Sequence, residues 1–572
     1  MIFGGVATLG SRGGNKPTPL ITVACIQRIL RQIGNMGLKQ LGDSAWLFQA
    51  ELGDLERNHR FILRLRKLIE ETRIPQIVDV VVSFESIVVH FQPMHGERVF
   101  QHLTDLKFED IPDDEEIQSS EFVIPVCYGK GDELDRLAGQ LGISVQELID
   151  LHSGAVYSVA AIGFSPGFPY LLGLPKKLRI PRLPTPRMVE SGSVAIAGGQ
   201  AGIYPNASQG GWHILGKTSV QLFDLNRERP SLLESGDQVR FQAVEGLEDL
   251  SVPLADEILL DIGDITILEP GPMTSVQDHG RYGYQAMGVS PGGAVDPILA
   301  TIANRLVGNA DDAAVLECTM AGPKMEFLKD SSIAFVGWRD ERSGRPISVK
   351  AGEVIDLTKP TQSLRGYIAI AGGIDVPVVL GSRSTDLRAN FGGHRGRELR
   401  QGDRLAVGVA GKGPVAGAWH VASPHVLLPQ VEVRFLRGIQ MHWFKDDARR
   451  RFVETVYRVS PTSDRMGSRL DGAALELKEP REMVSQPVIF GSVQVPPSGQ
   501  PIVLMSERQT IGGYPQIGHV ISADLPLMAR AWPGTAIRFR EVSIEEARHA
   551  WFELQRDLGI LQTGLALLVA EK

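Results

Sequence analysis

The chain has 572 residues, 43% of them hydrophobic and 22% charged, a balance typical of a soluble globular protein with several domains. Its formal net charge of −8 argues against a nucleic-acid-binding protein, because domains of that class are usually strongly basic. No apolar run approaches the length of a membrane span, and three isolated cysteines argue against a zinc or disulfide framework and favour the cytoplasm.

The first 40 residues are expected to be an extension. Up to residue 42 the chain carries five Lys or Arg residues and no Asp or Glu, which resembles the composition of a targeting peptide. Its apolar stretch, 20–26, is short and poorly placed for a signal peptide. We therefore expect residues 1–40 to be a disordered or mis-started extension.

Residues 41–108 are predicted to form a small α+β domain. A turn leads into a strand near residue 45, residues 61–71 form a charged amphipathic helix, and residues 77–91 hold two β-rich runs. The acidic segment 109–116 follows, and its dense like charges favour solvated, extended chain.

Residues 120–245 are predicted to form a β-rich lobe that begins with two helices. The second helix starts at a capping box, Ser144-Val145-Gln146-Glu147. After a second acidic segment, strand-rich sequence resumes, and residues 264–545 are expected to hold two further β-barrel lobes. A second capping box at Ser543 starts a C-terminal helix, with residues 546–572 as helix and tail.

An internal echo supports repeated lobes. Residues 192–196 read Gly-Ser-Val-Ala-Ile and residues 491–495 read Gly-Ser-Val-Gln-Val. Such self-similarity predicts two or three related β-barrel lobes.

Two motifs match the letter pattern of catalytic motifs but lack features that the chemistry needs. Residues 211–218 satisfy the Walker A pattern, but their bulky, β-prone interior does not suit a phosphate-binding loop. Residues 163–167 match the nucleophile elbow G-x-S-x-G, yet Pro166 lacks the backbone N–H that an oxyanion hole needs. The same G-x-S-P-G unit recurs at 288–292, and a turn that cradles substrate and a purely structural turn fit it equally well.

Several segments together resemble a known family. Residues 163–170, 185–187 and 198–205 resemble allophanate hydrolase subunit 1, also known as the B subunit of bacterial 5-oxoprolinase and as the Kip-type kinase inhibitor. Later segments resemble its partner, allophanate hydrolase subunit 2, which is the C subunit of 5-oxoprolinase; they are residues 276–281, 367–375, 380–385, 463–467 and 494–501. The resemblance covers roughly residues 41–539, and the chain looks like a natural fusion of the two subunits.

This resemblance implies a mainly β fold with α+β parts, in which cyclophilin-like β-barrel lobes are preceded by a small α+β domain; residues 120–245 would be the subunit-1 lobe. It also implies ATP-dependent opening of 5-oxoproline to glutamate, together with a third 5-oxoprolinase component, the LamB/YcsF-type A subunit. The same module forms the carboxyltransferase part of urea carboxylase, where it meets carboxybiotin.

The leading hypothesis is therefore an ATP-dependent 5-oxoprolinase component that uses 5-oxoproline, ATP and water and releases glutamate, ADP and phosphate. The expected cofactor is ATP, with Mg²⁺ as a candidate companion. No Ala-Met-Lys motif occurs, so no covalent biotin is expected on this chain. A biotin-dependent carboxyltransferase acting on urea or a related amide, and a non-catalytic regulator of a histidine kinase, stay open as alternatives, as does a homo-oligomer.

Candidate site residues follow from side-chain chemistry and motif membership. Phosphoryl activation of a lactam needs cationic clamps for anions and polar groups that hold the ring. His152 lies at a helix end, where it could cap carbonyl groups or bind substrate. The spacing of the histidines supports no zinc site. The candidates are Asp278, Arg465 and Glu507 for catalysis, and His152, Ser165, Gln200, Tyr204, Gln277, Arg281, Arg383, Gln509 and Tyr514 for substrate binding.

Overall fold

The computed structural model describes residues 36–106, 119–129, 132–183, 185–247, 263–411, 413, 419–421, 430–481 and 483–570. Nearly all of the predicted extension, the acidic segment 109–116 and most of the second acidic segment lie outside these residues. Within the described ranges, no helix combines the length and the apolar character that a membrane crossing requires.

The small α+β domain is a four-stranded antiparallel sheet in the order β1-β2-β4-β3, with two helices packed on it. Helix α2 begins after Asp54, whose side chain accepts the N–H of Arg57. The first described strand of the domain begins at Met36, within the predicted extension. Its elements are β1 (Met36–Leu41), β2 (Ala45–Ala50), α2 (Leu55–Glu71), β3 (Ile77–Val82), β4 (Ser86–Phe91) and α3 (Gly96–Thr104).

A closed seven-stranded barrel follows, in the order β10-β7-β6-β13-β5-β12-β9. Helix α5 begins at the predicted cap, where Ser144 Oγ accepts the N–H of Glu147 at 3.1 Å. The Walker-like match runs into a strand, β12 (His213–Lys217). The other elements are β5 (Glu121–Tyr128), α4 (Asp132–Leu141), α5 (Val145–Ser153), β6 (Val156–Ile162), β7 (Pro169–Leu172), β9 (Ser193–Ala197), β10 (Gln200–Ile203), β13 (Gln238–Ala243), and the two-stranded sheet of β8 (Arg187–Val189) and β11 (Ser208–Gly210).

Two open five-stranded sheets come next, and they pack face to face around a shared apolar core that includes Ile267, Val276, Leu316 and Ile368. Helix α6 (Pro297–Leu306) covers the other face of the second sheet. The first sheet consists of β20 (Val354–Asp356), β17 (Lys324–Phe327), β14 (Ile265–Glu269), β23 (Arg404–Val407) and β22 (Ile374–Asp375). The second consists of β15 (Met273–Gln277), β16 (Val315–Ala321), β21 (Pro360–Ile370), β18 (Ser331–Val336) and β19 (Ile347–Val349).

A second closed seven-stranded barrel follows, in the order β24-β31-β28-β29-β26-β25-β32. The region 264–545, expected to hold two barrel lobes, thus has one closed barrel and one pair of open sheets. Its elements are β24 (Gln430–Arg437), α7 (Asp446–Glu454), β25 (Tyr457–Val459), β26 (Gly467–Asp471), β28 (Ser492–Gln494), β29 (Ile502–Leu504), β31 (Gln516–Val520), α8 (Leu525–Arg530), β32 (Ala536–Glu541), α9 (Ile544–Ala570), and the two-stranded sheet of β27 (Gln486–Pro487) and β30 (Ile511–Gly512).

The two barrels share one topology. In each, the first strand pairs in parallel with the last, as β5 does with β13 and β24 with β32. The strands then match in order, β6 with β25, β7 with β26, β9 with β28, β10 with β29 and β12 with β31, and each barrel carries its own two-stranded side sheet. The sequence echo falls on the equivalent strands β9 and β28, so the prediction of related barrel lobes is confirmed.

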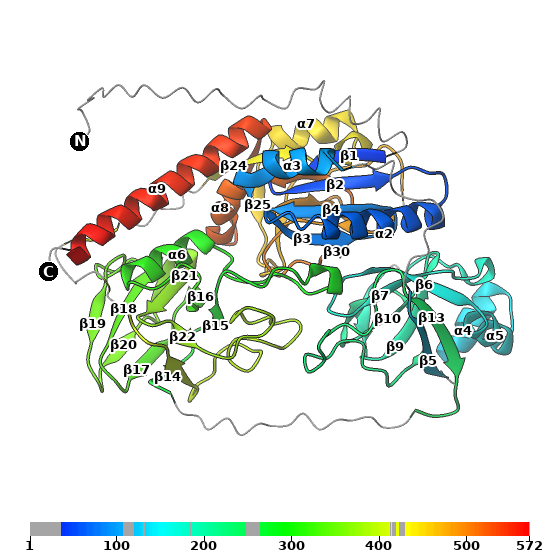
Figure 1. Cartoon of the computed structure of the whole chain (residues 1–572), viewed down its shortest axis with the longest axis horizontal. Helices are drawn as coiled ribbons and strands as arrows, with labels where there is room; N and C mark the ends of the chain where they lie inside the picture. The colour runs from blue at the N-terminus through cyan, green and yellow to red at the C-terminus, as the bar shows by residue number, and fades with distance from the viewer. Residues whose placement is uncertain are drawn as a thin grey trace.

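The units contact one another in a way that does not follow chain order. The small domain lies against the second barrel, although more than 300 residues separate them (Figure 1). Asp43 accepts hydrogen bonds from the N–H and hydroxyl of Ser522, and Ser83 Oγ donates to the carbonyl of Ser485. Helix α9 runs across α6 on the two-sheet unit.

Candidate functional site

The two G-x-S-P-G loops lie in contact with each other. The N–H of Gly167 donates to the carbonyl of Met287 at 2.9 Å. A Cβ on Gly288 would lie 2.4 Å from the carbonyl oxygen of Ser165, so only glycine fits there. Beside them, Gly163 packs on Ile511 of the second barrel. The repeated motif therefore marks the junction of the first barrel with the rest of the molecule.

The second loop also holds the second barrel. Ser290 Oγ donates to the carbonyl of Ser506 at 2.9 Å, and the N–H of Gly292 donates to the same oxygen at 3.2 Å. Ser506 directly precedes Glu507, so this contact positions a predicted catalytic residue beside the junction.

Arg465 is the centre of a buried ionic network. This side chain, 2% exposed, lies on the loop between β25 and β26. Its Nε donates to Glu507 at 2.6 Å, its Nη1 donates to Glu317, and its Nη2 donates to the carbonyl of Gly293 at 2.7 Å. Tyr367 donates its hydroxyl to the second carboxylate oxygen of Glu317 at 2.7 Å. Arg465 thus neutralises two carboxylates and ties the second barrel to the two-sheet unit.

Asp278 organises the loops at the end of β15. Its Oδ1 accepts hydrogen bonds from the N–H of Gly280 at 2.7 Å and from the hydroxyls of Ser382 at 2.7 Å and Ser384 at 2.5 Å. Its Oδ2 accepts the N–H of Arg383 at 2.5 Å. The Arg383 guanidinium itself makes an ion pair at the surface. The carboxylate therefore has four donors and fixes two loops relative to each other.

Arg281 lies in the same region with most of its donors unused. Its side chain is 1% exposed, and Nη2 donates to the carbonyl of Ser384. Across the described ranges, its Nε and Nη1 have no hydrogen-bond partner, and no carboxylate lies within ion-pair distance. The guanidinium lies 4.9 Å from the ring centre of Phe391, and its Nη1 would be 3.5 Å from a Cβ on Gly292. A buried cation with free donors suits an anionic ligand.

Three more candidates lie near these groups. Gln277 is fully buried, and its Nε2 donates to Ser275, while its Oε1 has no partner among the residues that the structure describes. Gln509, on the connection between β29 and β30, donates from Nε2 to Gln494 Oε1 at 3.3 Å. Tyr514, 40% exposed, accepts the Nε2 donor of Gln494 at its backbone carbonyl. The last two residues lie at the β27–β30 side sheet of the second barrel.

The structure places the other candidates within the first barrel. His152 is buried in the core, where its Nδ1 lies 2.7 Å from the hydroxyl of Tyr128 and its ring stacks on Phe241. Burial lowers the pKa of His152 to about 3. The ring of Tyr204 packs in an aromatic cluster, and Gln200 lies on the neighbouring strand β10, where no described residue is a partner of its Oε1. These three are not brought into contact with Arg465 or Arg281.

Several residues of the site escaped sequence reasoning. Glu317 and Tyr367 belong to strands that read as ordinary apolar segments, and their partners are distant in sequence. Arg508 is 4% exposed, and burial lowers its pKa to about 10. Gln494 and Gln516 face each other on β28 and β31. Only Gln494 could have been found from the sequence, by comparing the two echoed segments. The residue that matches it in the first barrel is alanine, so a polar side chain replaces a small apolar one.

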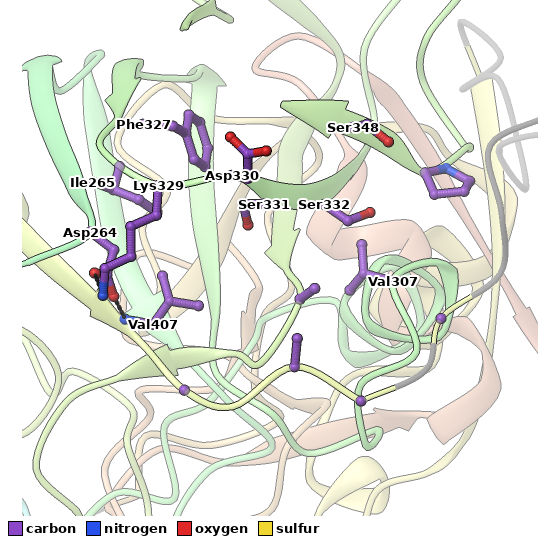
Figure 2. Close-up of a pocket in the computed structure, with 16 residues that line it drawn as sticks. Asp264, Ile265, Val307, Phe327, Lys329, Asp330, Ser331, Ser332, Ser348 and Val407 are labelled. Carbon is purple, nitrogen blue, oxygen red and sulfur yellow. Dashed lines mark hydrogen bonds and ion pairs between the residues drawn. The ribbon is translucent and has the colours of Figure 1, made fainter. Parts of the chain in front are cut away.

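A cavity of about 450 Å³ lies in the two-sheet unit, apart from these residues (Figure 2). Asp264 and Lys329 form an ion pair of 2.6 Å on one side, and Ser331, Ser332 and Ser348 lie on the other. No predicted site residue lines it. The cavity is therefore separate from Arg465, Asp278 and Arg281 at the junction.

The described residues contain no group of three His, Cys, Asp or Glu side chains that could hold a metal ion. Two predicted catalytic residues, the carboxylates Asp278 and Glu507, already accept hydrogen bonds from protein donors. Mg²⁺ is often held by one or two carboxylates together with substrate phosphates. A nucleotide would accordingly have to supply most of the ligands of such an ion.

Two family models match the chain. Residues 36–233 match "carboxyltransferase domain, subdomain C and D", and residues 287–541 match "carboxyltransferase domain, subdomain A and B". The first range covers the small domain and most of the first barrel, and the second covers most of the two-sheet unit and the second barrel.

Named relatives match the two halves separately. The chain is 39% identical over 300 residues to the C subunit of Escherichia coli 5-oxoprolinase, covering 51% of this chain and 96% of that protein. It is 34% identical over 221 residues to the B subunit of Bacillus subtilis 5-oxoprolinase, covering 36% and 91%. Urea amidolyase of Saccharomyces cerevisiae is 30% identical over 310 residues, 50% of this chain but 17% of that protein. The crystal structure of TTHA0988 matches 87% of this chain and 99% of its own, with 34% identity and a TM-score of 0.76.

Proposed function

Since the chain belongs to the carboxyltransferase-domain family that includes the B and C subunits of 5-oxoprolinase, we propose that it is a fused B–C component of an ATP-dependent 5-oxoprolinase. Its substrates would be 5-oxoproline, ATP and water, and its products glutamate, ADP and phosphate. Its partner would be the LamB/YcsF-type A subunit, because the relatives are named as two subunits of a larger enzyme.

The observation that carries this proposal is the buried guanidinium of Arg281, which keeps Nε and Nη1 free of partners in the described structure. Both 5-oxoproline and ATP are anions, and an oxyanion would satisfy these donors with charge-assisted hydrogen bonds. Urea is neutral and gives the guanidinium no counter-charge. Arg281 therefore suits the binding of 5-oxoproline or ATP better than the binding of urea itself.

The surrounding residues have supporting roles in this proposal. A lactam carbonyl is a poor electrophile, and transfer of a phosphoryl group to its oxygen prepares the carbon for attack by water. Phosphoryl transfer depends on positioning and on stabilisation of charge. Arg465 has its donors occupied by Glu317, Glu507 and Gly293, so it holds the loops in place, whereas Arg281 meets the anion.

A biotin-dependent carboxyltransferase is the second candidate. The descriptions of both matching family models favour it, and carboxybiotin also carries a carboxylate that Arg281 could bind. The biotin carrier would be another polypeptide in that case.

The test is ATP hydrolysis by the purified chain mixed with a LamB/YcsF-type partner, with and without 5-oxoproline. We expect glutamate to appear in step with ADP, and we expect Arg281→Met to lower this activity about 100-fold, as loss of one charge-stabilising group does in other enzymes. Arg342→Met, which removes a surface arginine paired with Asp340, is the matched control and should keep most of the activity. Phosphate release at the same rate with and without 5-oxoproline would contradict the proposal and make carboxyl transfer the leading candidate function.

A further inference from the structure

Five glutamines gather at the side sheet of the second barrel. We call them the glutamine cluster; they are Gln440, Gln486, Gln494, Gln509 and Gln516. Gln494 and Gln516 are directly opposite each other on β28 and β31 and are 1% and 0% exposed. Gly512 of β30 lies directly against them, and a Cβ at this position would lie 2.4 Å from Gln494 Nε2. The cluster reaches solvent through Gln509, which is partly exposed.

The hydrogen bonds of the cluster are incomplete. Gln440 donates from Nε2 to Gln486 and accepts the backbone N–H of Gln516, and Gln509 donates to Gln494. Within the described residues, however, both amide atoms of Gln516 and the Oε1 of Gln509 have no partner. A buried donor or acceptor left unpaired is costly, so such groups normally meet a ligand, water or another side chain.

The first barrel shows that the fold does not require these amides. At the equivalent place, Ala195 faces Ile214, and Gly210 on β11 lies above Tyr204. Aromatic and aliphatic side chains fill that site. One barrel therefore satisfies the same architecture with apolar packing, while the other keeps buried amides with free donors and acceptors. Stability alone does not explain the second choice.

We propose that the glutamine cluster is a binding site for a cis-amide edge, that is, a ring whose N–H and C=O lie on the same side. The carboxamide of Gln516 offers one free donor and one free acceptor in a plane, which is complementary to such an edge through two parallel hydrogen bonds. A trans peptide group points its N–H and C=O in opposite directions and cannot make both. Lactams and cyclic ureas have the required edge.

Under the proposed function, on which this assignment of the occupant rests, the ligand is the lactam edge of 5-oxoproline. The same chemistry is present in the ureido ring of biotin. The two sources differ in a way that an experiment resolves, since one belongs to the oxoprolinase reaction and the other to carboxyl transfer.

The test is a binding titration of the full chain with four probes: 5-oxoproline, 2-pyrrolidinone, N-methyl-2-pyrrolidinone and biotin, followed by ligand-observed NMR. The N-methyl lactam has lost the N–H, so we expect it to bind at least tenfold more weakly than 2-pyrrolidinone. Gln516→Leu should weaken the binding of 2-pyrrolidinone by at least tenfold. The melting temperature of this variant should stay at or above that of the parent protein, because an unpaired buried amide is removed.

Gln500→Leu is the matched control. Gln500 belongs to the same barrel, but its amide is already paired with both the N–H and the carbonyl of Gly472, so its loss should leave probe binding unchanged. Should Gln516→Leu fail to fold, Gln509→Leu changes a partly exposed member of the cluster and gives the same readout. Equal binding of the two lactams, or no loss in either variant, would overturn the site. Tighter, Gln516-dependent binding of biotin would support the site and count against the oxoprolinase proposal.

Discussion

Two buried arginines near the junction have opposite surroundings. For Arg465, burial lowers the pKa, but the carboxylates of Glu317 and Glu507 outweigh burial and the pKa ends above its usual value. For Arg281, burial dominates and the pKa falls, although acidic groups lie in the neighbourhood. The first guanidinium is thus stabilised by the protein itself. The second has no counter-ion in contact with it among the residues that the structure describes, which is the state in which an incoming anion gains most.

His152 gives a prediction at the same scale. Burial lowers its pKa from 6.5 to about 3, so the unfolded chain takes up a proton at mildly acidic pH that the folded protein does not. The contribution of a neutral buried histidine is fully present above about pH 6.5 and is lost as the pH falls toward about 3. We expect His152→Gln to reduce the fall in unfolding free energy across this window by up to about 1.4 kcal/mol per pH unit. Denaturant titrations at several pH values measure this slope.

Tyr128→Phe is the control for that experiment. It removes the hydrogen bond between the Tyr128 hydroxyl and His152 Nδ1 but keeps the histidine. Unfolding free energy should therefore decrease by a similar amount at every pH, and the slope should stay as in the parent. A slope that His152→Gln leaves unchanged would show that the histidine is protonated in the folded barrel.

At the scale of elements, the glycine of the second G-x-S-P-G loop decides how closely the loops approach. Gly288 has a φ of +78° and no room for a Cβ beside Ser165, whereas Gly283 has a φ of +88° and no atom within 4 Å of its Cβ position. Gly283→Ala should lower the free energy of unfolding by about 1–2 kcal/mol, because of the left-handed backbone alone. Alanine at Gly288 should cost at least about 2 kcal/mol more, because the clash is with backbone. Urea unfolding of both variants compares them directly, and equal costs would contradict the close contact.

Elements with local signals were predictable from sequence. The capping boxes at Ser144 and Ser543 begin helices α5 and α9, because cap and amide are three residues apart. The echo of β9 in β28 predicted related barrels. The ion pair of Arg465 with Glu317 joins residues 148 positions apart, and no local pattern encodes such a distance. The same holds for the two G-x-S-P-G loops. The sequence shows that the motif is repeated, but it does not show that the two copies contact each other.

At the scale of the whole molecule, the duplicated barrels explain the division of roles. Both keep the strand order and a side sheet, but the first fills the space under this sheet with Tyr204 and neighbouring aromatic rings, and the second fills it with glutamines. The family resemblance predicted the barrels. The amides without hydrogen-bond partners could be identified only from the structure, which shows which strands lie next to each other. A repeated fold therefore supplied the scaffold, and substitutions at equivalent positions gave one copy polar groups that can bind a ligand.

The two halves correspond to relatives named as different subunits, so their contact should survive without the covalent link. Asp79 of the small domain accepts three hydrogen bonds from the other half, from the N–H of Gly283 at 2.9 Å and from the backbone and side-chain nitrogens of Gln285 at 3.1 and 3.2 Å. We expect fragments 1–247 and 248–572, produced together, to co-purify as a one-to-one complex. Asp79→Ala should weaken that complex by about 10–100-fold, because it leaves buried donors unpaired. Glu71→Ala changes an exposed carboxylate of the same domain and should leave the affinity unchanged; fragments that elute separately would show that the link itself holds the halves together.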